Sequence, residues 1–162
     1  MKSNKRLVIW GYAVELICAL SVEVVLVLCI STEKLVEFVS KTALAWATLT
    51  GLLFGVALAI WIVLFQVATT RFGDWLERRG ALRVYSAAFV TAAGVYGSAT
   101  ALLILASYGS VLRSVIYVAL FGLLLAIINT YTVIRNGMDL LHLQATFRAR
   151  LREVQQRDPK SM

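Results

Sequence analysis

Four long stretches of the chain are almost entirely apolar, and each is long enough to cross a bilayer as a helix. We place them at residues 7–30, 42–70, 84–112 and 114–134. A helix needs about 20 apolar residues to span the hydrocarbon core. Apolar residues fill every side of these helices, without the period-two alternation of membrane barrel strands. The pattern predicts an all-α polytopic membrane protein with four transmembrane helices.

Residues 71–83 form a loop between the second and third spans, and this loop is richer in polar residues than the spans are. Gly73 and Gly80 are the expected helix breakers in this loop. The segment 74–78 between them is a candidate helical turn at the level of the lipid headgroups.

Two further segments mix apolar residues with charges. Residues 33–41 predict a short amphipathic helix that lies on the outer membrane surface. After the fourth span, Asn136-Gly137 indicates a bend. Beyond it, apolar residues or Gln recur at spacings of three and four, at Leu140, Gln144, Phe147, Leu151 and Val154. We therefore divide the chain into a transmembrane domain, residues 1–134, and a cytoplasmic amphipathic helix with its tail, residues 135–162.

Three interpretations of this tail helix remain open at the level of sequence. Its apolar stripe can lie on anionic lipid headgroups, pair with another copy as a short coiled coil, or pack against its own bundle. Two heptads alone are too few to decide between them.

The composition excludes most soluble classes of protein. Of the 162 residues, 60% are hydrophobic and 15% are charged, and there is one proline. A water-soluble domain of this length cannot bury so much apolar surface. The same figures exclude a disordered, collagen-like or disulfide-rich secreted chain.

The distribution of Lys and Arg predicts the orientation in the membrane. They concentrate in the first six residues, in the 71–83 loop and in the tail, whereas the other loops carry only Lys34, Lys41 and Arg113. The positive-inside rule therefore predicts that both termini are cytoplasmic, and we expect a bacterial inner (cytoplasmic) membrane. The net charge of +7 then reflects this bias and an attraction to anionic lipid headgroups, not nucleic-acid binding. Candidate residues for docking to the membrane or to a partner are Arg78, Arg79, Arg148, Arg150 and Arg152.

Small residues predict how the second and third spans pack. Residues 43, 47, 51, 55 and 59 are all Ala or Gly at every fourth position. Such ladders let two helix backbones approach closely in lipid. We expect Gly51 and Gly55 to face the third span near Gly97, in a tight antiparallel hairpin within one subunit.

Glu15 and Glu23 are the most informative residues for function. A carboxyl group inside a membrane is costly, so both should face protein, water or a partner. They lie about 12 Å apart along the helix and about 80° around it, so one sector of the first span is acidic. The pair can line a cation path or relay protons. Alternatively, each forms a structural hydrogen bond with a polar residue of a neighbouring span, of which the candidates are Thr48, Thr50, Thr91, Ser98, Thr100 and Asn129.

Two other polar features of the spans have a functional and a structural interpretation. Asn129, Thr130 and Thr132 form a patch that we place beside Gln66, Thr69 and Thr70 of the second span. The patch can form an inner mouth, but interhelical hydrogen bonding is the simpler interpretation. Arg113 can pair with Glu23, although extending to lipid phosphates is the default for such a residue.

The sequence carries no signature of an enzyme. His142 is the only histidine, and there is no Cys-x-x-Cys, nucleotide-binding loop or recognisable catalytic set. We therefore expect no catalytic residues, metal or cofactor. The leading hypothesis is a protein that self-assembles into a homo-oligomer and forms or gates an ion-permeable path. The alternative is a non-catalytic subunit of a larger complex, such as a transporter or respiratory accessory subunit, or a membrane component of a toxin–immunity or defence system.

Overall fold

The chain folds into helices throughout the part that the structure describes. The computed structural model describes the backbone of residues 3–108 and 113–157, and the side chains of residues 12–108 and 113–152. The helices are α1 (Ser3–Cys29), α2 (Thr32–Val67), α3 (Arg71–Arg78), α4 (Ala81–Ser107) and α5 (Arg113–Arg157). The expected all-α fold is confirmed for these residues. All the helices except α3 are long and apolar enough to cross a membrane, which indicates an integral membrane protein.

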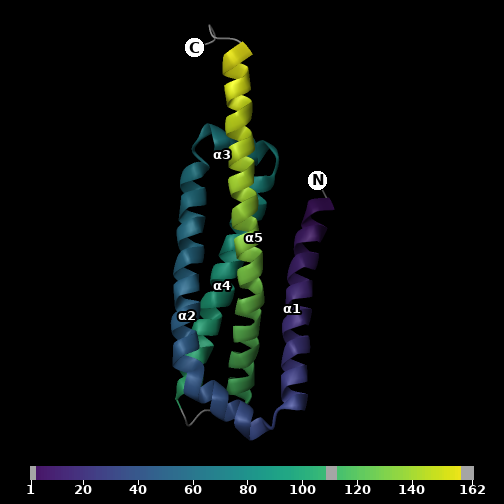
Figure 1. The fold of residues 1–162 in the computed structure, drawn as a ribbon, viewed down its shortest axis with the longest axis vertical. Coiled ribbons are helices and arrows are strands. Elements are labelled where there is room, and N and C mark those ends of the chain that lie inside the picture. Colours follow the sequence, from purple (N-terminus) through teal and green to yellow (C-terminus); the bar gives the residue numbers. More distant parts are fainter. Residues whose placement is uncertain (1–2, 109–112, 158–162) are drawn as a thin grey trace.

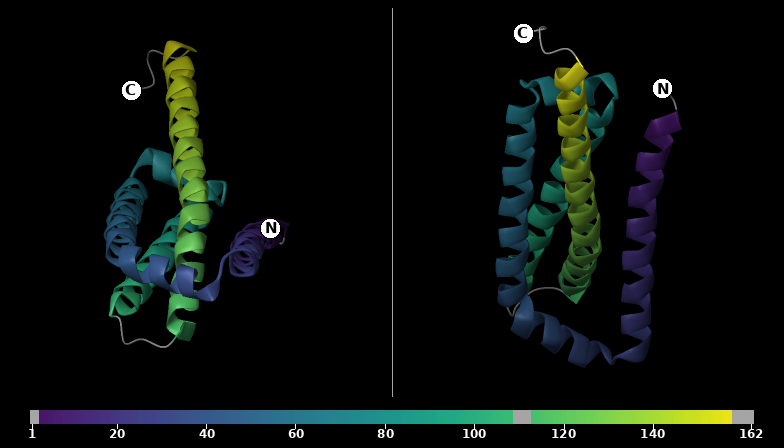
Figure 2. Two further views of the ribbon diagram at one scale, coloured as in Figure 1. Left: turned by 60° about the horizontal axis from the view of Figure 1, so that its bottom comes forward. Right: turned by 45° about the horizontal axis from the view of Figure 1, so that its top comes forward.

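Three of the long helices form a core, and the remaining one stands beside it. α2, α4 and α5 pack together, whereas α1 lies outside this group and runs alongside α5 (Figures 1 and 2). The short helix α3 lies at one end of the bundle, where α1 begins and the last turns of α5 emerge (Figure 1). We call this the α3 end.

The core helices meet along seams with alternating spacings of three and four residues. On α4 the buried positions Phe89, Ala92, Tyr96, Ala99, Leu103 and Ala106 follow this spacing, and on α5 Ile116, Ala119, Leu123 and Ala126 do the same. This is the spacing of left-handed helix packing. A line of residues at every fourth position turns by roughly 40° per step, so it cannot stay on such a seam.

The small-residue ladder of α2 shows this drift. Ala43 and Ala47 are buried, but Gly55 is exposed. A Cβ on Gly51 would lie 3.8 Å from Thr100 of α4, and one on Gly97 would lie 3.4 Å from the ring of Phe54. A Cβ on Gly55 would meet nothing within 4 Å. Gly51 and Gly97 therefore lie at the contact between α2 and α4, whereas Gly55, which we expected there, lies outside it within this chain.

The expected amphipathic helix at residues 33–41 is the first part of α2. It crosses the end of the bundle opposite to α3 before the rest of α2 rises alongside α4 (Figure 2). Leu35 and Val39 are buried in one cluster with Ile116 and Leu120 of α5. Part of the apolar face of this segment thus packs on the bundle, and its position at the membrane surface stays a prediction.

Helix α3 confirms the expected turn at 74–78 and extends it to Arg71. The Thr70 hydroxyl caps the helix by accepting a 3.3 Å hydrogen bond from the backbone N–H of Gly73. The prediction that Gly73 breaks the helix is wrong, because Gly73 lies inside α3. A Cβ there would come within 2.6 Å of Ala68 and closer still to the Val67 carbonyl oxygen, so only glycine fits. Gly80 does separate α3 from α4, with a φ of +68° that favours glycine.

The predicted bend after the fourth span is wrong, because α5 is one continuous helix of 45 residues. The tail stripe continues the seam by which α5 packs in the core, and Leu140, Gln144 and Phe147 are half-buried. The ring of Phe147 lies 5.3 Å from that of Phe72 and 5.6 Å from that of Trp75 of α3. The first part of the tail therefore packs on its own bundle, and the last turns of α5 project beyond α3 (Figure 1). The Val154 side chain lies outside the described residues.

Candidate functional site: an intramembrane carboxyl group between α1 and α5

The part of α1 whose side chains the structure describes, residues 12–29, makes little contact with the rest of the chain. Between residues 12 and 29, only Glu15 and Ala19 are buried, at 8% and 0% exposure. Large apolar side chains on the remaining faces are exposed, including Val14, Ile17, Leu20, Val25 and Leu28. The two buried residues are one helical turn apart and face α5, the principal neighbour of α1. The attachment of α1 therefore depends on a narrow strip of its surface.

Both carboxyl oxygens of Glu15 accept hydrogen bonds from α5. The side-chain amide of Asn129 donates to Oε2 at 2.9 Å, and the hydroxyl of Thr132 donates to Oε1 through a short hydrogen bond. Asn129 and Thr132 are three residues apart, so they lie on the same face of α5. This arrangement satisfies a buried carboxylate without a cation.

Asn129 retains an unused acceptor. The residue is 1% exposed, and its Oδ1 atom has no hydrogen-bond partner among the described residues. A buried polar atom without a partner is costly. If Glu15 carried a proton, a turned-over Asn129 amide would accept a hydrogen bond from it through Oδ1. Asn129 and Thr132 can therefore bind Glu15 in either protonation state.

A second polar pair supports α5 on its other side. The Tyr96 hydroxyl of α4 and the Thr130 hydroxyl lie 3.0 Å apart, and Thr130 donates its proton to the carbonyl of Ala126 at 2.8 Å. Tyr96 is therefore the donor of this pair. On α1, the Tyr12 hydroxyl lies near Thr91 of α4. Polar contacts thus reach from α1 through α5 to α4 at one level of the bundle.

In the structure, the acidic residue Glu15 lies against the polar patch of α5, which we had treated as a separate feature. Glu15 pairs with Asn129, one of its six candidate partners, and with Thr132, which we had assigned only to the polar patch. The patch faces α1 and α4, and no hydrogen bond joins it to Gln66, Thr69 or Thr70 within the described part of the chain. Thr132 lies three residues from Asn129, so both side chains are on one face of the helix and can reach the same acidic residue. This spacing is the feature of the sequence that could have identified Thr132.

Glu23 does not share the environment of Glu15. It is half-buried on α1 and has no hydrogen bond to any described residue. Arg113, its possible partner, is exposed, and the one ion pair among the described side chains joins Lys41 to Glu37 at 2.6 Å. The acidic sector therefore consists of one bound carboxyl group and one without a partner in the described residues.

The arginines predicted to dock on membrane or partner all lie toward the α3 end. Arg78 is exposed on α3, and the guanidinium of Arg79 lies 4.2 Å from the centre of the Trp75 ring. Arg148, Arg150 and Arg152 are exposed on the last turns of α5. These side chains are available at the surface, apart from the stacking of Arg79.

Neither a metal cluster nor a relative identifies the site. Within residues 12–108 and 113–152, no three His, Cys, Asp or Glu side chains come together. Comparisons of the chain with protein families, with curated proteins and with solved structures find no match. The class that the fold defines, over the described residues, is an all-α protein with four helices long and apolar enough to cross a membrane.

Proposed function

We propose that this chain is a non-enzymatic integral membrane protein that self-assembles and forms or gates an ion-permeable path. The observation that supports this most is the position of Glu15. It is a buried carboxyl group on a helix that is otherwise only lightly attached to the bundle. Ionisable residues inside membrane spans are rare, and they usually mark ion pathways or proton relays.

In this proposal, the contact between Glu15 and α5 acts as the gate. An ionised Glu15 accepts hydrogen bonds from Asn129 and Thr132, whereas a protonated Glu15 has one proton to donate. A change of protonation therefore rearranges the hydrogen bonds that fix α1. Because Asn129 and Thr132 can bind both forms, α1 stays attached to α5 while the charge at this position changes.

Assembly of several copies follows from the number of helices. One chain with four spans cannot enclose a wide aqueous path. Glu23 lies about 12 Å further along α1 than Glu15 and is only half-buried, so it is free to line a path between copies. In this arrangement α1 faces the path, and the core of α2, α4 and α5 supports it from outside.

The orientation belongs to the same proposal. The positive-inside rule puts the α3 end, with both termini, in the cytoplasm, and we propose a bacterial inner membrane as the location. Arg78, Arg148, Arg150 and Arg152 then lie at the cytoplasmic surface, where they can bind anionic headgroups or a cytoplasmic partner.

Ion flux from liposomes tests the proposal. Purified protein is reconstituted, and cation and proton release are followed for the parent, for Glu15→Gln and for Glu15→Gln combined with Glu23→Gln. Gln preserves the shape of Glu15 and can bond to both Asn129 Oδ1 and Thr132, so it keeps α1 in place while it removes the charge. We expect Glu15→Gln to reduce flux at least tenfold and the double variant to abolish it.

The matched control is Glu33→Gln, an exposed acid at the start of α2 outside the acidic sector. It should conduct like the parent. If the parent gives no flux, or if the double variant conducts as well as the parent, the proposal is wrong.

The exposed apolar face of α1 also favours the alternative, a non-catalytic subunit of a larger complex. In that case the face and Glu23 would bind a different chain, with a Lys or Arg opposite the acid. The mass of the detergent-solubilised particle distinguishes the two functions. A multiple of 17.9 kDa supports self-assembly, and a stoichiometric second polypeptide supports the alternative.

A further inference from the structure

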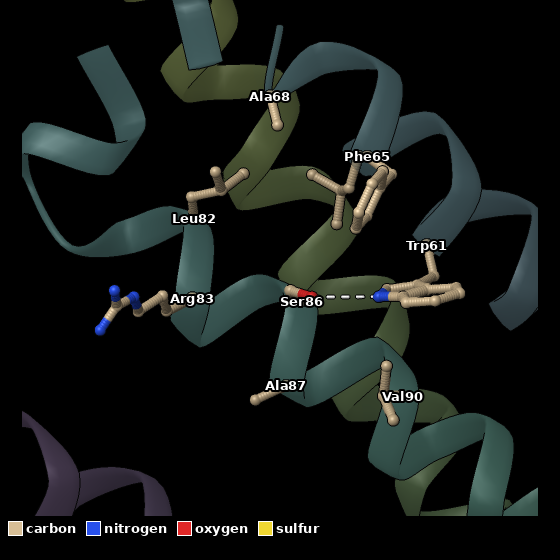
Figure 3. Close-up of a pocket in the computed structure, with 9 residues that line it drawn as sticks. Trp61, Phe65, Ala68, Leu82, Arg83, Ser86, Ala87 and Val90 are labelled. Atoms are coloured by element: carbon tan, nitrogen blue, oxygen red, sulfur yellow. Dashed lines mark hydrogen bonds between the residues drawn. The ribbon is translucent and has the colours of Figure 1, made fainter. Parts of the chain in front are cut away.

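A groove lies between α2 and α4 near the α3 end, away from the Glu15 site. Its volume is about 400 Å³, which is within the range of small-molecule sites. It is lined from α2 by Trp61, Leu64, Phe65 and Ala68 and from α4 by Leu82, Arg83, Ser86, Ala87 and Val90 (Figure 3). The groove is open to the outside of the bundle, on the surface that a membrane would cover.

The walls of the groove are almost wholly apolar. The indole N–H of Trp61 donates a 3.0 Å hydrogen bond to the hydroxyl of Ser86 across the two helices. This bond satisfies the one polar group of the indole, so Trp61 presents only its ring to the groove. Phe65 and Val90 are 69% and 47% exposed. An occupant must therefore be mainly apolar, as an acyl chain is.

Arg83 gives the groove a positive rim. Among the described residues that line the groove, it is the only charged one, and it is exposed. Figure 3 shows the Arg83 side chain directed away from Trp61 and Val90, so its guanidinium group lies apart from the apolar walls. A guanidinium group in this position can bind a phosphate with two parallel hydrogen bonds.

The positive charge and the apolar walls follow one another along the bundle, as the headgroup and the acyl chains do in a phospholipid. Arg83 is in the first turn of α4, at its polar end, and Val90 lies seven residues further on. Seven residues of helix span about 10 Å. The charge is therefore at the end of the groove that is nearest to the polar α3 segment, and the apolar walls extend from it toward the middle of the bundle.

We propose that this groove binds one anionic phospholipid, with its phosphate at Arg83 and an acyl chain against Phe65, Trp61 and Val90. The proposal needs only a membrane around α2 and α4, and it does not depend on the gating role of Glu15. The site would select the lipid headgroup by charge at the cytoplasmic leaflet, where anionic lipids are concentrated.

Quenching of Trp61 fluorescence by brominated lipids tests the proposal. The protein with Trp10, Trp46 and Trp75 changed to Phe is reconstituted in phosphatidylcholine vesicles. Part of the lipid is then replaced by phosphatidylglycerol or by phosphatidylcholine with brominated acyl chains. We expect half-maximal quenching at a several-fold lower mole fraction of the brominated phosphatidylglycerol.

Two variants separate the charge from the groove. Arg83→Gln should abolish the preference for phosphatidylglycerol, whereas Arg71→Gln, an equal change of charge at an exposed position of α3, should retain it. Ala87→Phe fills the groove and keeps Arg83, so it should reduce quenching by both lipids. Equal quenching by the two lipids in the parent, or a preference that survives Arg83→Gln, would overturn the proposal.

Native mass spectrometry of the chain with all its Trp residues provides a second measurement in case the Trp substitutions disturb the fold. The parent and the Arg71→Gln protein should retain one phosphatidylglycerol at activation energies that remove phosphatidylcholine. If Arg83→Gln retains it equally well, the groove is only an ordinary lipid-facing surface.

Discussion

Glu15 and Asn129 are 114 residues apart in the sequence, and they are joined by a 2.9 Å hydrogen bond in the structure. The bond connects α1, whose described side chains are mostly exposed, to the longest helix, α5. Because Asn129 is almost completely buried, the bond forms inside the contact between the helices rather than at its edge. Together with the Thr132–Glu15 bond, it joins α1 to α5.

A double-mutant cycle measures the strength of this link. Glu15→Ala, Asn129→Ala and the double variant are compared by thermal unfolding in detergent. Hydrogen bonds between membrane helices contribute about 0.6–2 kcal/mol, so we expect a coupling energy in that range. Ile17→Ala on the exposed side of α1 is the control, and it should show no coupling with Asn129→Ala. Additive effects of the Glu15 and Asn129 changes would show that the bond does not stabilise the fold.

The different environments of Gly51 and Gly55 predict a difference between two similar variants. A leucine at position 51 would collide with α4, since even a Cβ there lies 3.8 Å from Thr100. We expect Gly51→Leu to lower the unfolding temperature of the detergent-solubilised chain by several degrees. Gly55→Leu should leave it almost unchanged, because nothing lies within 4 Å of that position.

The Gly55→Leu variant also tests whether Gly55 lies at a contact between copies of the chain, through the mass of the detergent-solubilised particle. If Gly55 belongs to a contact between copies, the variant should reduce the mass of the particle without destabilising the single chain. Equal loss of stability in both glycine variants would contradict the packing seam described for α2.

The sequence was sufficient to predict the helical class and the number of long apolar helices. Hydrophobic length is a local property, and a continuous apolar run without the alternation of barrel strands satisfies its backbone inside a membrane only as a helix. It also indicated the residues of the candidate site, because Glu15, Asn129 and Thr132 are conspicuous among apolar neighbours.

The sequence did not predict which polar residues pair between helices, or which residues form the packing seams. Whether Glu15 meets α4 or α5 depends on how the four spans are arranged, which hydropathy does not encode. The ladder of small residues predicted a contact along every fourth residue, but the observed seams have a spacing of 3.5 residues and exclude Gly55. Gly73 resembled a breaker because glycine disfavours helices. Its actual role depends on the approach of Val67 and Ala68, which only the fold reveals.

Gly73 and Gly137 should respond in opposite ways to replacement by alanine. Gly73→Ala places a Cβ within 2.6 Å of Ala68, so α3 must shift. We expect a loss of about 1–3 kcal/mol of stability, as for other overpacked sites. Gly137→Ala meets nothing within 4 Å in the middle of α5, and it should stabilise the helix by about 0.5–1 kcal/mol. Unfolding of both variants in the same detergent checks the prediction. A destabilising Gly137→Ala would indicate that α5 bends there after all.

The aromatic contact of Phe147 with Phe72 and Trp75 should determine how far the order of α5 extends beyond the membrane. Aromatic pairs contribute about 0.5–1.5 kcal/mol beyond their buried area, and no other aromatic contact joins α3 to α5 in the described residues. We expect Phe147→Ala to increase hydrogen exchange of the amides of residues 140–152 severalfold, while exchange in residues 116–130 stays unchanged. Leu141→Ala, which removes a side chain 67% exposed on the same helix, is the control and should leave both regions protected. If Phe147→Ala exchanges like the parent, the last turns of α5 are stable by themselves, and the contact with α3 is not what orders them.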